Sequence, residues 1–267
     1  MKQPIDAKKI VIKIGTSSLT YENGKLNIRI LDRLCRVISD LSNSGKDVIL
    51  VSSGAIGVGM GKLLMKERPV LTKYKQAVAA VGQCELMFMY DKIFSDYNTT
   101  VAQVLLTNSI IKNECTKKNV INTLDTLFSM NIVPIVNEND TVSTDELEGL
   151  NLGDNDNLSS IVARLVNADL LIILTDTDGL YDSNPAVNKN AKKIDRVEKI
   201  TEDIRIIATG SSSNRGTGGM SSKINAVASV YDYGIDCCIM NGKDPEKIYD
   251  LLNGENIGTY FNSNKNK

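Results

Sequence analysis

Two clusters of acids and amides near the middle of the sequence could bind a polar substrate. One is NEND, from Asn137 to Asp140, and the other is GDNDN, which contains Asn155 and Asp156. A single Asp or Asn before a helix is typical of an N-cap. A cap explains one residue of GDNDN, but it does not explain two acid–amide pairs in succession. We therefore expect these clusters to orient a polar substrate and to hold lysines in place.

Lysines and glycines in two other segments suit a phosphate. Lys13 lies in an apolar stretch two positions before Gly15, where a solvated charge at the edge of a sheet is the alternative explanation. The segment RGTGGMSSK, residues 215–223, places three glycines before a helix that carries Lys223. Backbone N–H groups at a helix N-terminus and a nearby lysine favour a polyphosphate. A flexible glycine-rich linker is the alternative for this segment.

A third glycine-rich segment, SSGAIGVGMGK, gives a weaker indication. It spans residues 52–62 and contains Ser53 and Gly54. Its spacing matches neither GxxxxGK[ST] nor GxGxxG. The small residues that follow a predicted strand here would still allow backbone N–H groups to approach an anion.

The composition excludes several kinds of active site. The chain has 267 residues, a net charge of −1 and no histidine, so neither a Ser-His-Asp triad nor the commonest metal ligand is available. Its five cysteines form no CxxC pair, which argues against a disulfide framework or a zinc site. The charge gives no indication of nucleic-acid or membrane binding, and there is no signal peptide and no apolar run of membrane-spanning length. We expect a cytoplasmic protein.

Short apolar segments alternate with segments of helical periodicity. The segments predicted as strands are 9–15, 47–54, 101–107, 131–140, 169–181 (a strand and its turn) and 235–240. The segments predicted as helices are 31–41, 73–97, 124–128, 157–166 and 219–234. This alternation indicates an α/β fold with a mostly parallel sheet and helices on both faces. No linker divides the chain, so we expect one domain with two lobes, about 1–150 and about 151–267.

Small or polar residues follow four of the predicted strands. They are Gly15–Ser17, Ser52–Ala55, Asn137–Asp140 and Thr175–Asp176. Turn residues explain any one of these segments. Because ligands of open parallel sheets bind at the carboxyl ends of the strands, the four together favour a ligand site at that edge.

Six motifs occur in an order that resembles the amino acid kinase family. They are VIKIGTSSLT, VSSGAIGVG, VPIVNENDTVS, GDNDNLSS, LTDTDGLY and GTGGMSSK. The combination of NEND and GDNDN is most similar to the members that phosphorylate L-glutamate. The resemblance covers essentially the whole chain and implies a three-layer αβα sandwich that uses ATP and Mg²⁺. The reaction it implies is transfer of phosphate to the γ-carboxylate of L-glutamate, giving L-glutamyl 5-phosphate in the first step of proline biosynthesis.

The resemblance also implies roles for individual residues. Lys13 and Lys223 resemble lysines that stabilise charge on the phosphates, and Asp156 resembles the aspartate that organises them. The residues that match substrate-binding positions are Ser53, Asn137, Asp140 and Asn155. The residues that match nucleotide-binding positions are Lys13, Gly15, Gly54, Thr175, Asp176, Gly216, Thr217, Gly218, Gly219, Met220, Ser221, Ser222 and Lys223.

The resemblance has further implications for partners. It implies a homodimer or homotetramer, feedback inhibition by proline, and a downstream reductase that receives the glutamyl phosphate. Many bacterial relatives carry a C-terminal PUA domain, and we expect none here because the sequence ends shortly after Phe261.

Two alternatives stay open. One is a sister kinase that acts on acetylglutamate or uridine monophosphate. The other is a nucleotide or amino-acid sensor without turnover, against which the presence of Lys13, Asp156 and Lys223 argues.

Overall fold

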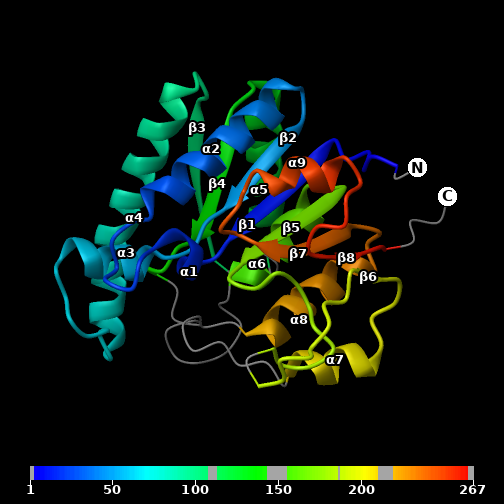
Figure 1. The fold of residues 1–267 in the computed structure, drawn as a ribbon. Coiled ribbons are helices and arrows are strands. Elements are labelled where there is room, and N and C mark those ends of the chain that lie inside the picture. Colours follow the sequence, from blue (N-terminus) through cyan, green and yellow to red (C-terminus); the bar gives the residue numbers. More distant parts are fainter. Residues whose placement is uncertain (1–2, 108–112, 143–154, 186, 210–218, 264–267) are drawn as a thin grey trace.

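The structure, a computed structural model of the chain, describes residues 3–107, 113–142, 155–185, 187–209 and 219–263. In this part of the chain one eight-stranded sheet has the order β3-β4-β2-β1-β5-β7-β8-β6 (Figure 1). The strands are β1 (Lys9–Ile14), β2 (Asp47–Val51), β3 (Val101–Leu106), β4 (Val133–Glu138), β5 (Leu170–Thr175), β6 (Arg196–Val197), β7 (Asp236–Asn241) and β8 (Thr259–Phe261). All six predicted strands are therefore present, and β6 and β8 were not predicted.

The sheet is mostly parallel, as predicted. The central strand β1 pairs in parallel with β2 on one side and β5 on the other, so Lys13 lies opposite Val51 and Ile173. Only the pairing of β8 with β7 is antiparallel among the ladders of the described residues. Lys13 is therefore a residue of a central strand and not a solvated edge charge.

Helices cover both faces of the sheet and complete a three-layer αβα sandwich (Figure 1). They are α1 (Thr16–Leu19), α2 (Ile28–Asn43), α3 (Ala55–Lys62), α4 (Thr72–Asp96), α5 (Glu114–Ser129), α6 (Asn155–Leu165), α7 (Glu202–Thr209), α8 (Met220–Tyr231) and α9 (Lys247–Leu252). All five predicted helices are present. The sequence did not predict α1, α3, α7 and α9.

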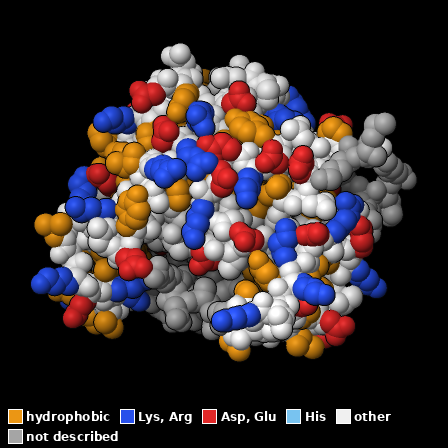
Figure 2. Space-filling view, viewed as in Figure 1, with side chains coloured by type: hydrophobic (Ala, Val, Ile, Leu, Met, Phe, Trp, Pro, Cys, Tyr) orange, Lys and Arg blue, Asp and Glu red, His pale blue; other side chains and the backbone are white. Residues whose placement is uncertain are grey.

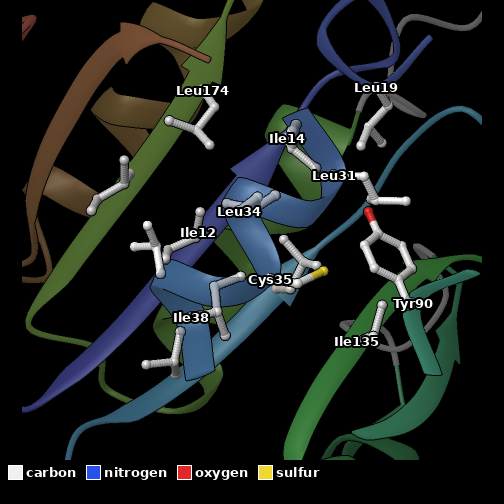
Figure 3. Packing of buried hydrophobic residues seen from close by; sticks show 14 of the residues in the cluster. Ile12, Ile14, Leu19, Leu31, Leu34, Cys35, Ile38, Tyr90, Ile135 and Leu174 are labelled. Atoms are coloured by element: carbon white, nitrogen blue, oxygen red, sulfur yellow. The ribbon is translucent and has the colours of Figure 1, made fainter. Parts of the chain in front are cut away.

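Two hydrophobic cores lie on opposite faces of the sheet because successive side chains of a strand point in opposite directions. In β1, Ile10, Ile12 and Ile14 belong to the core formed with α2, α3, α4 and α9. Val11 belongs to the second core, with α6 and α8. Figure 3 shows the first core, in which Ile12 and Ile14 lie beside residues of α2.

Helix α3 corrects the interpretation of its glycines. The sequence weakly indicated that all four glycines of this segment help backbone N–H groups to approach an anion at a helix start, and Ala55–Lys62 is a helix that packs tightly on α4. A Cβ added at Gly59 would lie 2.0 Å from the carbonyl oxygen of Val78, and one at Gly61 would lie 2.3 Å from that of Gly24. These two glycines are therefore required by backbone packing. Gly54, which precedes the helix, is treated with the site below.

The described residues form no helix of the length and apolarity needed to cross a membrane. On the face shown in Figure 2, the acidic and basic side chains of the described residues are interspersed, which agrees with the net charge of −1.

Candidate active site

Three charged side chains meet at the carboxyl end of the central strands. Lys13 comes from the end of β1, Asp156 from the first turn of α6, and Lys223 from the first turns of α8. Lys13 Nζ lies 2.6 Å from Asp156 Oδ1, and Lys223 Nζ lies 3.0 Å from Asp156 Oδ2. We call Lys13, Asp156 and Lys223 the ionic cluster.

The ionic cluster is almost fully buried. Lys13 is 4% exposed, Asp156 0% and Lys223 7%. Burial alone would raise the pKa of Asp156, but the ammonium groups of Lys13 and Lys223 outweigh it and hold the pKa well below its ordinary value. Asp156 is therefore ionised at neutral pH. Two ammonium groups and one carboxylate give the cluster a net positive charge, which suits an anionic ligand.

Ser222 also contacts Asp156. Its hydroxyl donates to Asp156 Oδ2 at 2.8 Å, on the same helix as Lys223. The resemblance implies nucleotide binding for Ser222, which stays a prediction; the structure adds that its hydroxyl hydrogen-bonds the Asp156 carboxylate. Asp156 lies within α6, so the sequence alternative that it caps this helix is wrong.

Two glycines follow the ends of β1 and β2, and the first of them lies beside the ionic cluster. A Cβ added at Gly15 would lie 3.6 Å from Lys13 Nζ, so Gly15 lies next to the ammonium group. Gly54 precedes α3 with a φ of +95°, a conformation that favours glycine. A Cβ at Gly54 would lie 3.3 Å from Thr16 Cγ2. Both glycines follow strand ends, a position at which backbone N–H groups commonly bind phosphate oxygens.

A second, neutral cluster lies next to the ionic cluster. The Asn155 amide nitrogen donates to Ser53 Oγ at 2.9 Å, to Ser52 O at 3.0 Å and to Asn137 Oδ1 at 3.1 Å. Asn137 Nδ2 in turn donates to Gln83 Oε1 at 2.7 Å. We call Gln83, Asn137, Asn155, Ser52 and Ser53 the amide cluster. Because Asn155 and Asp156 are consecutive, the two clusters adjoin.

The remaining predicted residues are placed as follows. Asp140 is buried, at 9% exposed, just beyond the end of β4. Thr175 ends β5 and donates to the Asp176 carboxylate at 3.2 Å. Gly219, Met220 and Ser221 lie at the start of α8. Gly216, Thr217 and Gly218 lie outside the described residues.

Sequence reasoning missed Gln83 and Tyr90, both from α4. Tyr90 OH lies 2.9 Å from Ser52 Oγ. No sequence motif marks either residue, because they lie in the interior of a long helix whose pattern indicates only packing. Among the residues the structure describes, no three His, Cys, Asp or Glu side chains are grouped so as to hold a metal ion.

Comparison with known proteins identifies the family. Residues 8–241 match the model of the amino acid kinase family. This chain belongs to the amino acid kinase family. It is 56% identical over 261 residues to a glutamate 5-kinase of Clostridium perfringens, with 97% of each chain covered. It is 51% identical over 256 residues to a glutamate 5-kinase of Enterococcus faecalis, covering 96% of this chain and 94% of the relative.

A solved structure agrees with the fold. The UMP kinase of Bacillus anthracis is 17% identical, with a TM-score of 0.63 and 97% of each chain covered. At that identity the likeness concerns the amino acid kinase fold alone. The predicted three-layer α/β fold and the predicted family are both confirmed.

Proposed function

We propose that this protein is an ATP-dependent kinase that phosphorylates the γ-carboxylate of L-glutamate to give L-glutamyl 5-phosphate, the first step of proline biosynthesis. The observation that carries the proposal is the ionic cluster, in which two buried lysines share Asp156 directly beside a cluster of neutral hydrogen-bonding groups. Near-full-length similarity to glutamate 5-kinases supports the choice of substrate. The fold neighbour that acts on UMP supports only the fold.

The reaction needs no histidine. The attacking group is a carboxylate with a solution pKa of about 4.3, so it is ionised at neutral pH and needs no general base. The obstacle is the repulsion between this anion and an anionic phosphate. Phosphoryl transfer is promoted mainly by positioning and by stabilisation of charge. Lys13 and Lys223 bring two ammonium groups to this position, in a site where low solvent exposure strengthens their effect.

Asp156 fixes the positions of the two lysine ammonium groups. Each of its carboxylate oxygens receives one ammonium group, and Ser222 donates a further hydrogen bond. A lysine side chain is flexible, and a fixed partner lowers the number of conformations it samples. We assign Asp156 the role of organising the phosphate-binding lysines.

The amino acid is assigned to the side of the site that carries the amide cluster. Ser53, Asn137, Asp140 and Asn155 are the proposed substrate-binding residues. Hydrogen bonds join Ser53, Asn137 and Asn155, and Asp140 lies two positions beyond the end of β4. The first lobe, about 1–150, would thus bind the amino acid, with Asn155 contributed by the second.

The nucleotide is assigned to the second lobe, about 151–267. Thr175, Asp176 and the segment from Gly216 to Lys223 are its proposed contacts, with Gly15 and Gly54 facing the phosphates. The acids of the described residues are not grouped as a metal cage, so Mg²⁺ would be held largely by phosphate oxygens and water. Bound in this way, Mg²⁺ supplies further neutralisation of phosphate charge.

The proposal extends to location and partners. ATP and glutamate are metabolites of the cytoplasm, so we place the reaction there. A homodimer or homotetramer, inhibition by proline and transfer of the product to a reductase are proposed on the similarity to glutamate 5-kinases.

A hydroxylamine trap tests the proposed function. The protein is incubated with MgATP, hydroxylamine and one acceptor at a time: L-glutamate, acetylglutamate, aspartate or none. An acyl phosphate reacts with hydroxylamine to give a hydroxamate, so we expect product with glutamate alone. Product with another acceptor would assign a sister activity. Absence of product with every acceptor, from protein that still binds ATP, would favour the sensor.

A further inference from the structure

Helix α4 places two polar side chains against the candidate site. Gln83 and Tyr90 are seven positions apart, which is close to two helical turns, so they lie on the same side of the helix. Gln83 accepts from Asn137 Nδ2 at 2.7 Å, and Tyr90 hydrogen-bonds with Ser52 Oγ at 2.9 Å. One helix thus contacts both the end of strand β4 and the residue that follows β2.

Two backbone groups fix the orientation of the amides. The N–H of Glu138 can only donate, and it contacts Asn137 Oδ1 at 2.9 Å. The carbonyl of Ser52 can only accept, and it contacts Asn155 Nδ2 at 3.0 Å. Asn137 must therefore direct its Nδ2 towards Gln83, and the atom of Gln83 that receives it must be Oε1.

This orientation leaves a defined acceptor at the site. With its Nδ2 used three times, Asn155 has a buried Oδ1 with no hydrogen-bond partner among the described residues. A buried amide oxygen without a donor is unfavourable, and a donor from a ligand would relieve this cost. The α-ammonium group of an amino acid is a donor of the required charge and size.

The helix is held close to the site by a glycine next to Gln83. A Cβ added at Gly82 would lie 1.7 Å from the carbonyl oxygen of Ala55, the first residue of α3. The backbones of α3 and α4 are therefore in direct contact here. Gln83 therefore follows a residue whose backbone lies against Ala55, and Ala55 itself directly follows Ser53 and Gly54.

We infer that Gln83 is a positioning residue for the amino-acid acceptor, which it serves by holding the Asn137 amide so that Asn155 Oδ1 faces the α-ammonium group of the substrate. The inference rests on the proposed function. Gln83 acts through Asn137 and Asn155 and does not itself touch the phosphates. It should therefore affect the binding of the acceptor and not the transfer step.

Three variants test the inference in steady-state kinetics with the hydroxamate assay. Gln83→Met keeps the length of the side chain and removes the acceptor, whereas Gln83→Glu keeps an acceptor oxygen. Gln76→Met is the matched control, because Gln76 is a half-exposed glutamine two turns earlier in α4, outside the amide cluster. KM for glutamate, KM for ATP and kcat are measured for each, with the thermal midpoint as a control for folding.

We expect Gln83→Met to raise KM for glutamate about tenfold, the effect of one lost hydrogen bond, with kcat and KM for ATP within about twofold. Gln83→Glu should recover most of this loss, and Gln76→Met should match the wild type. Equal KM values for Gln83→Met and wild type, or a loss confined to kcat, would overturn the inference. So would a KM in Gln83→Glu as high as in Gln83→Met.

A double variant tests whether Gln83 acts through Asn137, and Gln83→Glu keeps the inference testable if Gln83→Met impairs folding. If Gln83 acts through Asn137, then adding Gln83→Met to Asn137→Ala should raise KM for glutamate no further. An additive increase would reject the inference. Wild-type protein that forms no hydroxamate would instead reject the proposed function, so the two failures are distinguishable.

Discussion

The ionic cluster and the amide cluster adjoin, yet they are built by different means. The ionic cluster joins β1, α6 and α8 through two charged contacts to a fully buried carboxylate. The amide cluster joins α4, α6 and the ends of β2 and β4 through neutral hydrogen bonds. A buried charge without its partner costs far more than a neutral group without one. The same sheet edge therefore combines a charged region suited to binding phosphate with a neutral region suited to recognising the acceptor by its hydrogen-bonding groups.

The largest effect is expected at Asp156. Asp156→Asn removes the only negative charge of the ionic cluster and leaves two buried ammonium groups beside a neutral amide. Loss of one partner from a buried ion pair costs about 3–5 kcal/mol of unfolding free energy. Urea denaturation measures this change, and Asp91→Asn, an exposed site on α4, is the control. A loss below about 1 kcal/mol would show that the cluster is effectively solvated.

The pH dependence of the Asp156→Asn effect gives a second measurement. The pKa of Asp156 is lowered in the folded protein by Lys13 and Lys223 and is about 3.9 in the unfolded chain. A depressed folded-state pKa contributes stability that is present above the unfolded pKa and is lost as the pH falls towards the folded pKa. The difference between wild type and variant should therefore be constant from about pH 6 to 8 and shrink below about pH 4. A difference that grew on acidification would contradict the assignment.

The two clusters should separate in enzyme kinetics. Lys13→Ala and Lys223→Ala remove charge stabilisation, and we expect kcat to fall about 10²–10³-fold in each. Asp140→Ala and Asn155→Ala should instead raise KM for glutamate about tenfold or more, with a smaller change in kcat. The hydroxamate assay with varied glutamate measures both constants. Unchanged kcat in both lysine variants would show that the ionic cluster does not stabilise charge during phosphate transfer.

The sequence predicted the ionic cluster better than the amide cluster. Lys13 and Lys223 could be singled out because a charge in an apolar strand, or next to a glycine-rich turn, is unusual. Asp156 stood out through the repeated acid–amide pairs of GDNDN, and its role came from the family resemblance. The topology then brought them together, since the carboxyl ends of parallel strands share one edge. Strand order β2-β1-β5, with α6 and α8 on one face, accomplishes this.

The support from α4 could not be predicted in the same way. Gln83 and Tyr90 are ordinary residues of a helix, and their importance depends on where that helix crosses α3. The close approach of the two helices depends on Gly59 and Gly82. Nothing in the sequence indicates that these two glycines contact each other. The glycines of α3 were instead interpreted as a weak anion-binding pattern, because Gly54, which does border the site, belongs to the same run.

A methyl group at Gly82 should disturb the amide cluster through the backbone. Gly82→Ala would place a Cβ 1.7 Å from the carbonyl oxygen of Ala55, so α3 and α4 must separate. Overpacking of this kind costs about 1–3 kcal/mol. We expect a matching loss in urea denaturation and a higher KM for glutamate, since Gln83 moves with the helix. Ala80→Gly, at an exposed position of α4, is the control and measures the difference in helix propensity with the opposite sign. If Gly82→Ala stabilises the protein by as much as Ala80→Gly destabilises it, the close crossing is not rigid.

The smallest effect is expected at Tyr90, the other contact of α4 with the amide cluster. Its ring lies in the hydrophobic core with Leu31, Cys35 and Ile135 (Figure 3), and only its hydroxyl meets Ser52. Tyr90→Phe keeps the ring and removes one hydrogen bond, for a loss of about 1 kcal/mol. Burial raises the pKa of Tyr90 well above its ordinary value, so the hydroxyl stays neutral and the loss should not vary between about pH 6 and 9. Tyr233→Phe, at an exposed tyrosine, is the control.

The same variant should have little effect on KM for glutamate. The carbonyl of Ser52 accepts from Asn155 whether or not the Ser52 hydroxyl is hydrogen-bonded, so KM for glutamate should change less in Tyr90→Phe than in Gln83→Met. A larger change in Tyr90→Phe would show that Tyr90 supports the acceptor site more than Gln83 does.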